Sequence, residues 1–447
     1  MARLAQQQAT TQRRYTRKKT KLALVLAGGG LTGATYEIGA LQALDYAFGG
    51  DFSVTDFDIV IGLSAGAFVG SLLVNGVKPA DMFFGLQREN PFIQVIDQLD
   101  IYYPNYTEAI SRSLTFPWKL LRHWIRDLLG QQPIDYYSYL DSFNELLPSG
   151  IFDNQRIEAY LRRNLSPEEG RTNDFRELDK ELFIAATDLD TGERVIFGDE
   201  QHRTTPISRA VQASTALPLF YKPVVIDGRE YTDGAIRKSL HIDVALKRGA
   251  DLVICINPLV PFYHDKSRKP IRVLSGPGEH LSEKGMVSIA HQVMRILVHS
   301  RISSGLEKYR RQYPHADILL IEPRRDDDQM FSYKLMNYAD RLSIARHGYE
   351  ETLEALLRRF NHFAGRFRKH GIRLSRARLQ VALNRIRQVP DDSYDLIERI
   401  LYPQQKQRKP LNRLNTVLNA LERHLAQLTG SPPSSEGTSS AKVERAA

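Results

Sequence analysis

Short runs of apolar residues, each ending near glycine or another small residue, organise much of the chain. Residues 22–27 and 57–61 are two such runs, and residues 252–256 form a third. Runs of this length are typical of parallel strands that are buried on both faces of a sheet. The first two runs lead into residues 34–44 and 67–73, whose small and apolar side chains predict helices. This repeated strand, turn and helix order predicts an α/β fold with a mostly parallel sheet.

Further segments extend this predicted order. Residues 181–187 predict a strand, residues 188–193 a turn, and the alternating residues 224–231 a hairpin. Residues 151–165 predict a helix, with Asp153 as a candidate cap at its start.

Two acidic clusters invite a metal interpretation. Asp188 and Asp190 lie in the predicted turn, and residues 324–328 combine two arginines with three aspartates. A hairpin turn and a solvated loop explain these clusters better than cation sites do. The histidines are scattered without metal-ligand spacing, so neither a metal nor a cofactor is predicted.

The segment Gly-Leu-Ser-Ala-Gly at residues 62–66 carries the strongest chemical signal. Between a strand and a helix, a G-x-S-x-G segment can form a sharp turn that lifts the serine hydroxyl above the sheet edge. The following helix would point its positive dipole end at a developing oxyanion. Ser64 is therefore a candidate nucleophile, and Gly62 and Gly66 would relieve crowding in the turn. The alternative is an inert tight turn that needs small residues.

A glycine-rich loop follows the first predicted strand. Gly28, Gly29 and Gly30 free several backbone N–H groups, which can converge on the oxyanion of an acyl-transfer intermediate. With Gly33, the same residues also spell G-x-G-x-x-G, the fingerprint of dinucleotide-binding proteins. The second strand, turn and helix at Ser64 separates the two interpretations, because an acyl hydrolase requires it and a dinucleotide site does not.

A third motif, Thr-Asp-Gly-Ala at residues 232–235, follows the predicted hairpin. An aspartate beside glycine is most often a turn residue. The preceding run at residues 210–223 favours a functional role for Asp233 over a simple turn. In their order along residues 21–349, the glycine loop, the serine motif, this run and Asp233 resemble the patatin-like phospholipase family.

The resemblance implies a three-layer α/β/α fold and the hydrolysis of acyl esters in lipids by a serine–aspartate dyad without histidine. By position, Ser64 would be the nucleophile and Asp233 its base. The oxyanion donors would be Gly28, Gly29 and Gly30, with Gly33, Gly62, Gly66 and Gly234 as motif support. Thr32 stands where the family usually has arginine or lysine, so the support of the glycine loop is expected to differ.

The proposed base places a condition on the fold. A carboxylate with an ordinary pKa near 4 is a poor base, and burial raises that pKa. Asp233 should therefore be desolvated.

Two alternatives to the serine–aspartate hydrolase stay open at this point. One is a serine–histidine–aspartate esterase that uses His241, which is close to Asp233 in sequence. The other is a lipid- or dinucleotide-binding protein that keeps the fold without turnover.

The chain is basic, with a net charge of +9 and a pI near 9.4. Basic residues collect at 13–19 and again at 366–387. An anionic membrane surface agrees with a lipid substrate, whereas solvated helix faces are the plainer explanation. Zinc-ligand spacing and RNA-binding signatures are missing, so nucleic acid is not a predicted partner.

Cysteine content and the length of the apolar segments indicate the cellular compartment. Cys255 lies inside the predicted strand 252–256, where it is expected to be an inert core residue, and one cysteine allows no intramolecular disulfide. No segment reaches the roughly 18 uninterrupted apolar residues of a membrane span. Residues 1–20 lack the apolar region of a signal peptide. These features predict a cytoplasmic protein that associates peripherally with membranes.

The domain organisation follows from composition and from where the motifs end. Residues 1–20 are predicted to be a disordered basic segment, and residues 21–350 the acyl hydrolase domain. Residues 351–429 are predicted to be a helical C-terminal extension, and residues 430–447, rich in serine and proline, a disordered tail. A leucine stripe at 411–428 could form a homo-oligomer or cover the main domain.

An aromatic insertion is predicted at residues 88–150, which contain both tryptophans of the chain. Within it, residues 114–129 fit an amphipathic helix with Trp118 on the apolar side and Arg122 on the polar side. The insertion is expected to be a lid or a membrane-facing surface, with a helix that covers the sheet as the alternative.

Overall fold

The computed structural model describes residues 20–49, 52–86, 93–114, 118, 121, 147–263 and 280–390. Three sequence predictions lie wholly or largely outside these residues. They are the basic N-terminal segment, the greater part of the aromatic insertion, and the leucine stripe with the tail that follows it.

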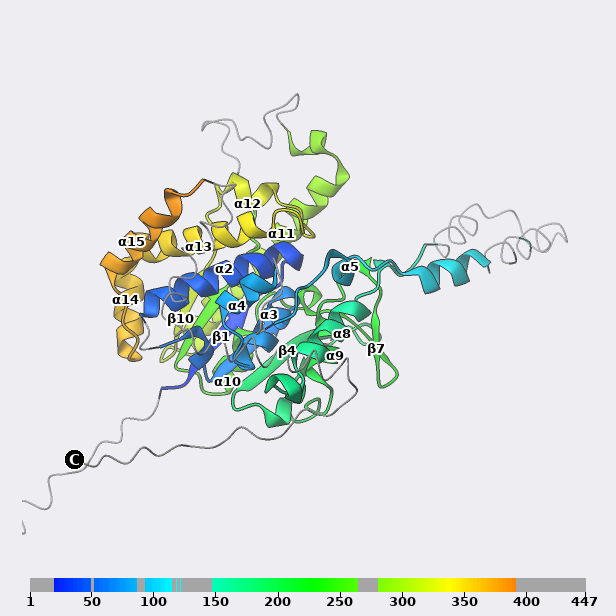
Figure 1. The fold of residues 1–447 in the computed structure, drawn as a ribbon, viewed down its shortest axis with the longest axis horizontal. Coiled ribbons are helices and arrows are strands. Elements are labelled where there is room, and N and C mark those ends of the chain that lie inside the picture. The colour runs from blue at the N-terminus through cyan, green and yellow to red at the C-terminus, as the bar shows by residue number, and fades with distance from the viewer. Residues whose placement is uncertain are drawn as a thin grey trace, which may run out of the picture.

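One sheet of eight strands lies at the centre of the described residues (Figure 1). Its order is β10-β9-β1-β2-β4-β8-β7, and β5 also pairs with β4. Strands β10, β9, β1, β2 and β4 are mutually parallel, whereas β5 and β8 run antiparallel to β4. The mostly parallel α/β sheet predicted from the sequence is confirmed. The strand bounds are β1 Leu22–Leu26, β2 Ile59–Leu63, β4 Glu181–Asp188, β5 Arg194–Phe197, β7 Val224–Ile226, β8 Arg229–Asp233, β9 Leu252–Ile256 and β10 Asp317–Ile321.

Alternate side chains of the central strands pack into two separate hydrophobic cores, one on each face of the sheet. In β1, Leu22, Leu24 and Leu26 pack with helices α2, α3 and α13, whereas Ala23 and Val25 pack with α10 and α11 on the other face. Because both faces are covered, the strands are apolar throughout. The predicted three-layer α/β/α architecture is confirmed. The helices are α2 Gly30–Phe48, α3 Ala65–Val74, α4 Pro79–Gly85, α5 Gln98–Ile101, α8 Gln155–Asn164, α9 Ile207–Ser214, α10 Ile242–Lys247, α11 Met286–Gln312, α12 Asp328–Ser332, α13 Arg341–Arg358, α14 Phe360–Lys369 and α15 Arg376–Arg387.

Residues 151–165 correct one sequence prediction. Gly150–Phe152 form strand β3, which pairs in parallel with β6 (Leu219–Tyr221), and the helix begins only at Gln155. The Asp153 carboxylate accepts a hydrogen bond from the Gln155 N–H at 2.9 Å and pairs with Lys222 at 2.6 Å. Helix propensity at the start of this segment is therefore overridden by pairing with a strand more than sixty residues away.

Helices α2 and α13 touch backbone to backbone. A Cβ placed on Gly39 would lie 1.9 Å from the Ala345 carbonyl oxygen, and one on Gly348 would lie 2.4 Å from that of Tyr36. Glycine at both positions lets the two helices approach closely. Further along, α14 and α15 contribute Phe363, Phe367, Leu379 and Leu383 to the same core as β1. Residues 351–390 therefore share the hydrophobic core of the preceding domain.

None of the described helices is both long and apolar enough to cross a bilayer.

The single cysteine lies in the core. Cys255 is fully buried in β9, and burial raises the pKa of its thiol well above the usual range. The thiol is therefore protonated and unreactive at neutral pH, as the sequence indicated.

The α2–α13 contact predicts opposite effects of two glycine substitutions. Gly39→Ala should lower the free energy of unfolding by about 3 kcal/mol or more, because its methyl group overlaps a main-chain carbonyl that cannot move aside. Gly365→Ala, in α14 where no atom lies within 4 Å of an added Cβ, should raise it by up to about 1 kcal/mol through helix propensity. Urea unfolding of both variants tests this; equal effects would mean that the helices can separate without cost.

Candidate active site

Strand register brings the three sequence motifs to one level of the sheet. Leu26 pairs with Gly62 across β1 and β2, so Gly28 lies level with Ser64. Leu63 pairs with Ala185 across β2 and β4, so Ser64 lies level with Ala186, which in turn pairs with Asp233 of β8. Residues that are far apart in sequence thus form one row at the sheet edge.

Ser64 sits in a strained turn between β2 and α3. Its backbone has φ 53° and ψ −120°, a conformation that a non-glycine residue adopts at a cost on the order of 1–3 kcal/mol. As the N-terminal cap of α3, its side chain makes no capping hydrogen bond. The hydroxyl is therefore not committed to the helix that it precedes, as expected for a nucleophile turn.

Ser214 holds this turn in place. The Ser64 N–H donates to the Ser214 hydroxyl at 2.8 Å, and that hydroxyl donates to the Ala185 carbonyl at 2.7 Å. Both groups are buried, so the serine ties the strained backbone to β4. Sequence reasoning included Ser214 only as one member of the run 210–223, because a contact across 150 residues leaves no local signal.

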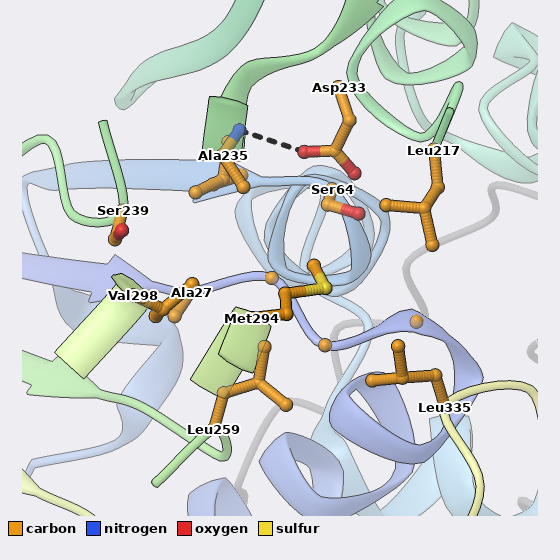
Figure 2. Close-up of a pocket in the computed structure, with 14 residues that line it drawn as sticks. Ala27, Ser64, Leu217, Asp233, Ala235, Ser239, Leu259, Met294, Val298 and Leu335 are labelled. Carbon is orange, nitrogen blue, oxygen red and sulfur yellow. Dashed lines mark hydrogen bonds between the residues drawn. The ribbon is translucent and has the colours of Figure 1, made fainter. Parts of the chain in front are cut away.

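Asp233 is almost completely buried beside Ser64. Its carboxylate accepts a hydrogen bond from the Ala235 N–H at 2.8 Å, and Figure 2 shows the Ser64 side chain on the same side of the pocket. Burial raises the pKa of Asp233 to about 6, against the hydrogen bonds of the Ser64 hydroxyl and the Ala235 N–H, which lower it. The desolvation that the sequence required of a carboxylate base is present at this position.

The glycine loop lies directly against Ser64. A Cβ on Gly28 would lie 3.0 Å from the Ser64 Cβ, and Gly30 combines φ 60° with a contact of 2.6 Å between its would-be Cβ and the Leu335 carbonyl oxygen. Within the described residues, the N–H groups of Gly28, Gly29 and Gly30 have no main-chain or side-chain acceptor. These donors line the pocket that also holds Ser64 and Asp233.

Thr32 supports the glycine loop in place of a basic residue. Its hydroxyl donates to the Lys334 carbonyl at 2.5 Å, and its N–H donates to the Leu335 carbonyl at 3.1 Å. The loop is therefore fastened to residues that follow α12, late in the chain. A short neutral side chain fits here because its partner is a carbonyl oxygen that approaches closely.

The remaining motif glycines permit close backbone contacts. A Cβ on Gly66 would lie 2.6 Å from the Ala27 carbonyl oxygen, and one on Gly234 would lie 2.6 Å from that of Ala185. Gly62 faces the Ala67 backbone, and Gly33 packs against Pro258. Side chains at these positions would push apart the turns that carry Ser64 and Asp233.

Two cavities are lined in part by Ser64 and share Gly30 and Leu217. The first is the pocket of Figure 2, whose walls also include Leu217, Met294 and Val298. The second is an almost wholly apolar cavity that begins at Ser64 and Gly30. Its walls come from Leu31, Ala34, Ile38, Phe68, Leu86, Ile96, Ile101, Ile157 and Met336, among others. Among the described residues, neither cavity is lined by lysine or arginine.

His241 lies in a different environment from Ser64. It is fully buried at the start of α10, where its Nδ1 is 3.3 Å from the Arg194 guanidinium. Burial and the positive charges of Arg194 and Lys238 lower the pKa of His241 to about 3. His241 is not among the residues that line either cavity at Ser64. The structure therefore gives no geometric support to a serine–histidine–aspartate triad.

Asp327 departs from the predicted solvated loop at residues 324–328, in which Arg324, Arg325 and Asp326 are exposed as expected. Its side chain is buried, accepts a hydrogen bond from the Met330 N–H, and lies 2.6 Å from His347 Nε2. Among the described residues, Asp327, His347 and Glu351 form the one group whose ligand atoms could surround a metal ion. The short Asp327–His347 distance is that of a direct hydrogen bond, so a shared proton already joins these two groups.

Comparisons with known proteins agree with the motifs. A family model described as Patatin-like phospholipase matches residues 24–246, which include Gly28, Ser64 and Asp233. "Probable lipid hydrolase 463L" of Invertebrate iridescent virus 6 is 22% identical over 252 residues, which cover 54% of this chain and 71% of the viral protein.

Two solved structures are also similar over most of their length. VipD from Legionella pneumophila is 15% identical, with a TM-score of 0.30 over 93% of this chain and 88% of VipD. The type III effector ExoU of Pseudomonas aeruginosa is 15% identical, with a TM-score of 0.24 over 92% of this chain and 80% of ExoU. Because these scores are low, the fold assignment rests on the sheet order and the family match.

The buried carboxyl of Asp233 predicts a pH-dependent cost in stability. Its raised pKa means that the folded state binds the proton more tightly than the unfolded state, so stability falls as pH rises from about 4 to about 6. Asp233→Asn should remove this cost and raise the free energy of unfolding at about pH 8 by up to about 3 kcal/mol, with no gain below about pH 4.

Urea unfolding across this pH range measures the effect. Asp190→Asn, on an exposed turn, controls for the loss of one carboxylate. Parallel stability curves for the wild-type and Asp233→Asn proteins would contradict the prediction.

Proposed function

The chain belongs to the patatin-like phospholipase family and is a hydrolase, and we propose that it cleaves fatty acyl esters of lipids by a Ser64–Asp233 dyad. The observation that carries the proposal is the row across the sheet edge, where Gly28, Ser64 and Asp233 stand at one level. This row supplies a nucleophile, a base and oxyanion donors around a single reacting atom.

The first half of the reaction forms an acyl-serine. Ser64 Oγ attacks the ester carbonyl carbon while its proton passes to the Asp233 carboxylate. The oxyanion accepts hydrogen bonds from the glycine-loop N–H groups, aided by the N-terminal end of α3. When the intermediate collapses, the ester C–O bond breaks and the leaving alcohol takes the proton back from Asp233.

The second half releases the fatty acid. Asp233 takes a proton from a water molecule whose oxygen attacks the acyl-serine, and the tetrahedral intermediate then expels Ser64 Oγ, which regains the proton. A pKa of about 6 suits this cycle. The carboxylate is ionised at neutral pH, yet it is more basic than an exposed aspartate. No cofactor or metal takes part.

The two cavities at Ser64 suggest how an ester would bind. The apolar cavity beside Ala34, Ile38 and Phe68 suits an acyl chain, because it offers almost no polar partner. The pocket beside Asp233 and Ser239 would take the alcohol side of the ester. In this orientation the carbonyl lies between Ser64 and the glycine loop, where the two cavities meet.

Labelling by a fluorophosphonate probe tests the dyad. Ser64→Ala should abolish both labelling and hydrolysis of a soluble ester, and Asp233→Asn should slow both by about a hundredfold or more. His241→Gln should retain both activities, because this side chain lines neither cavity at Ser64. Wild-type labelling of the Ser64→Ala protein would exclude Ser64 as the nucleophile. Loss of labelling in a stably folded His241→Gln protein would favour the triad instead.

Chain-length preference tests the apolar cavity. Ala34→Leu fills part of it and should lower kcat/KM for a long-chain ester by about tenfold relative to a short-chain ester, since each displaced methylene loses about 0.8 kcal/mol of burial. Ile38→Ala should shift the preference toward longer chains. The short-chain ester serves as the internal control in both variants. Equal changes for short and long esters would place the acyl chain elsewhere.

A further inference from the structure

An apolar stripe on α11 is exposed on the outside of the molecule. Met286 is 83% exposed, Val293 48% and Leu297 53%. At 100° per residue, the stripe covers only about 100° of the helix circumference. We define the α11 stripe as Met286, Ile289, Val293, Ile296 and Leu297. Figure 1 shows the N-terminal turns of α11 standing clear of the layered body.

The same helix face changes character along its length. Beyond Leu297 it continues with the exposed Ser300 and Ser304, and then with Glu307, Lys308 and Arg311. From Met286 to Leu297 the rise is about 16 Å at 1.5 Å per residue. One continuous face therefore passes from apolar through hydroxyl to charged side chains, of which two are basic and one is acidic, and the apolar-to-cationic order is the one met on leaving an anionic bilayer.

The neighbouring face of α11 builds the candidate active site. Met294 and Val298 line the pocket that contains Ser64 and Asp233. Arg301 donates a hydrogen bond at 2.7 Å to the Ile236 carbonyl, in the 3-10 turn η4 (Gly234–Ile236) that follows Asp233. Whatever covers the α11 stripe therefore lies immediately beside the pocket.

We propose that the α11 stripe inserts into the surface of a lipid bilayer, with Lys308 and Arg311 at the level of anionic headgroups. This inference rests on the proposed function, because a lipid ester has to pass from a bilayer into the pocket. Burial of the five apolar side chains supplies affinity, and the basic end supplies a preference for anionic lipid. The docked helix holds the pocket next to the membrane from which the ester comes.

Vesicle binding by the Ser64→Ala protein tests docking without turnover. In this background, Val293→Ser with Leu297→Ser should weaken partitioning onto phosphatidylcholine–phosphatidylglycerol vesicles by about tenfold or more, because two apolar side chains no longer gain from burial. Lys308→Glu with Arg311→Glu should remove the preference for phosphatidylglycerol while binding to phosphatidylcholine persists. Val381→Ser, which changes a 44% exposed valine on α15, is the matched control and should not alter binding.

Hydrolysis of a soluble ester by the Val293→Ser, Leu297→Ser protein with Ser64 intact should equal that of the wild type, since neither side chain lines the pocket. Undiminished vesicle binding by this variant would overturn the proposal. A change from dimer to monomer with vesicle binding intact would assign the stripe to a second copy. A large drop in melting temperature would assign it to the protein's own chain, and Met286→Ser then provides the milder variant.

The two proposals fail separately. Stripe-dependent vesicle binding by a protein that neither hydrolyses esters nor reacts with the fluorophosphonate probe would refute the proposed dyad and leave docking intact. Ser64-dependent hydrolysis, with vesicle binding that the stripe substitutions do not change, would refute docking by the α11 stripe and leave the dyad intact.

Discussion

Strand register is the constraint on which the candidate site depends. Parallel pairing of β1 and β2 sets Gly28 beside Ser64, and antiparallel pairing of β8 with β4 sets Asp233 at the same level. A slip of one residue in either pairing would turn the side chains to the opposite face of the sheet. The two cores on either side of the sheet hold the strands in this register. They thereby keep Gly28, Ser64 and Asp233 in one row.

This row contains features that are unfavourable in isolation. Ser64 occupies a strained backbone conformation, and Asp233 is a carboxyl removed from water, which raises its pKa to about 6. Hydrogen bonds from the surroundings stabilise both features. Ser214 fixes the Ser64 turn to β4, and the Ala235 N–H donates to the Asp233 carboxylate. Functional sites commonly contain destabilising features, and favourable packing in the hydrophobic core compensates for their cost.

Late segments of the chain complete the site. The backbone at Lys334 and Leu335 fastens the glycine loop through Thr32, and α11 contributes Met294 and Val298 to the pocket. The family match ends at residue 246, before α11 and before Lys334 and Leu335. The motifs thus supply the reacting groups, whereas the later helices shape the space around them and carry the proposed docking surface.

The sequence by itself determined the elements and the motifs. Apolar runs marked the parallel strands because both faces of the sheet are buried, and glycines marked the turns because only small residues fit there. It failed at residues 151–154, where strand pairing with β6 overrides local preference, and at Asp327, whose buried carboxylate forms a hydrogen bond with His347. Only the tertiary structure decided the register, the burial of the Asp233 carboxyl, the role of Ser214 and the walls of the cavities. These are contacts between residues distant in the chain, and local propensity carries no information about them.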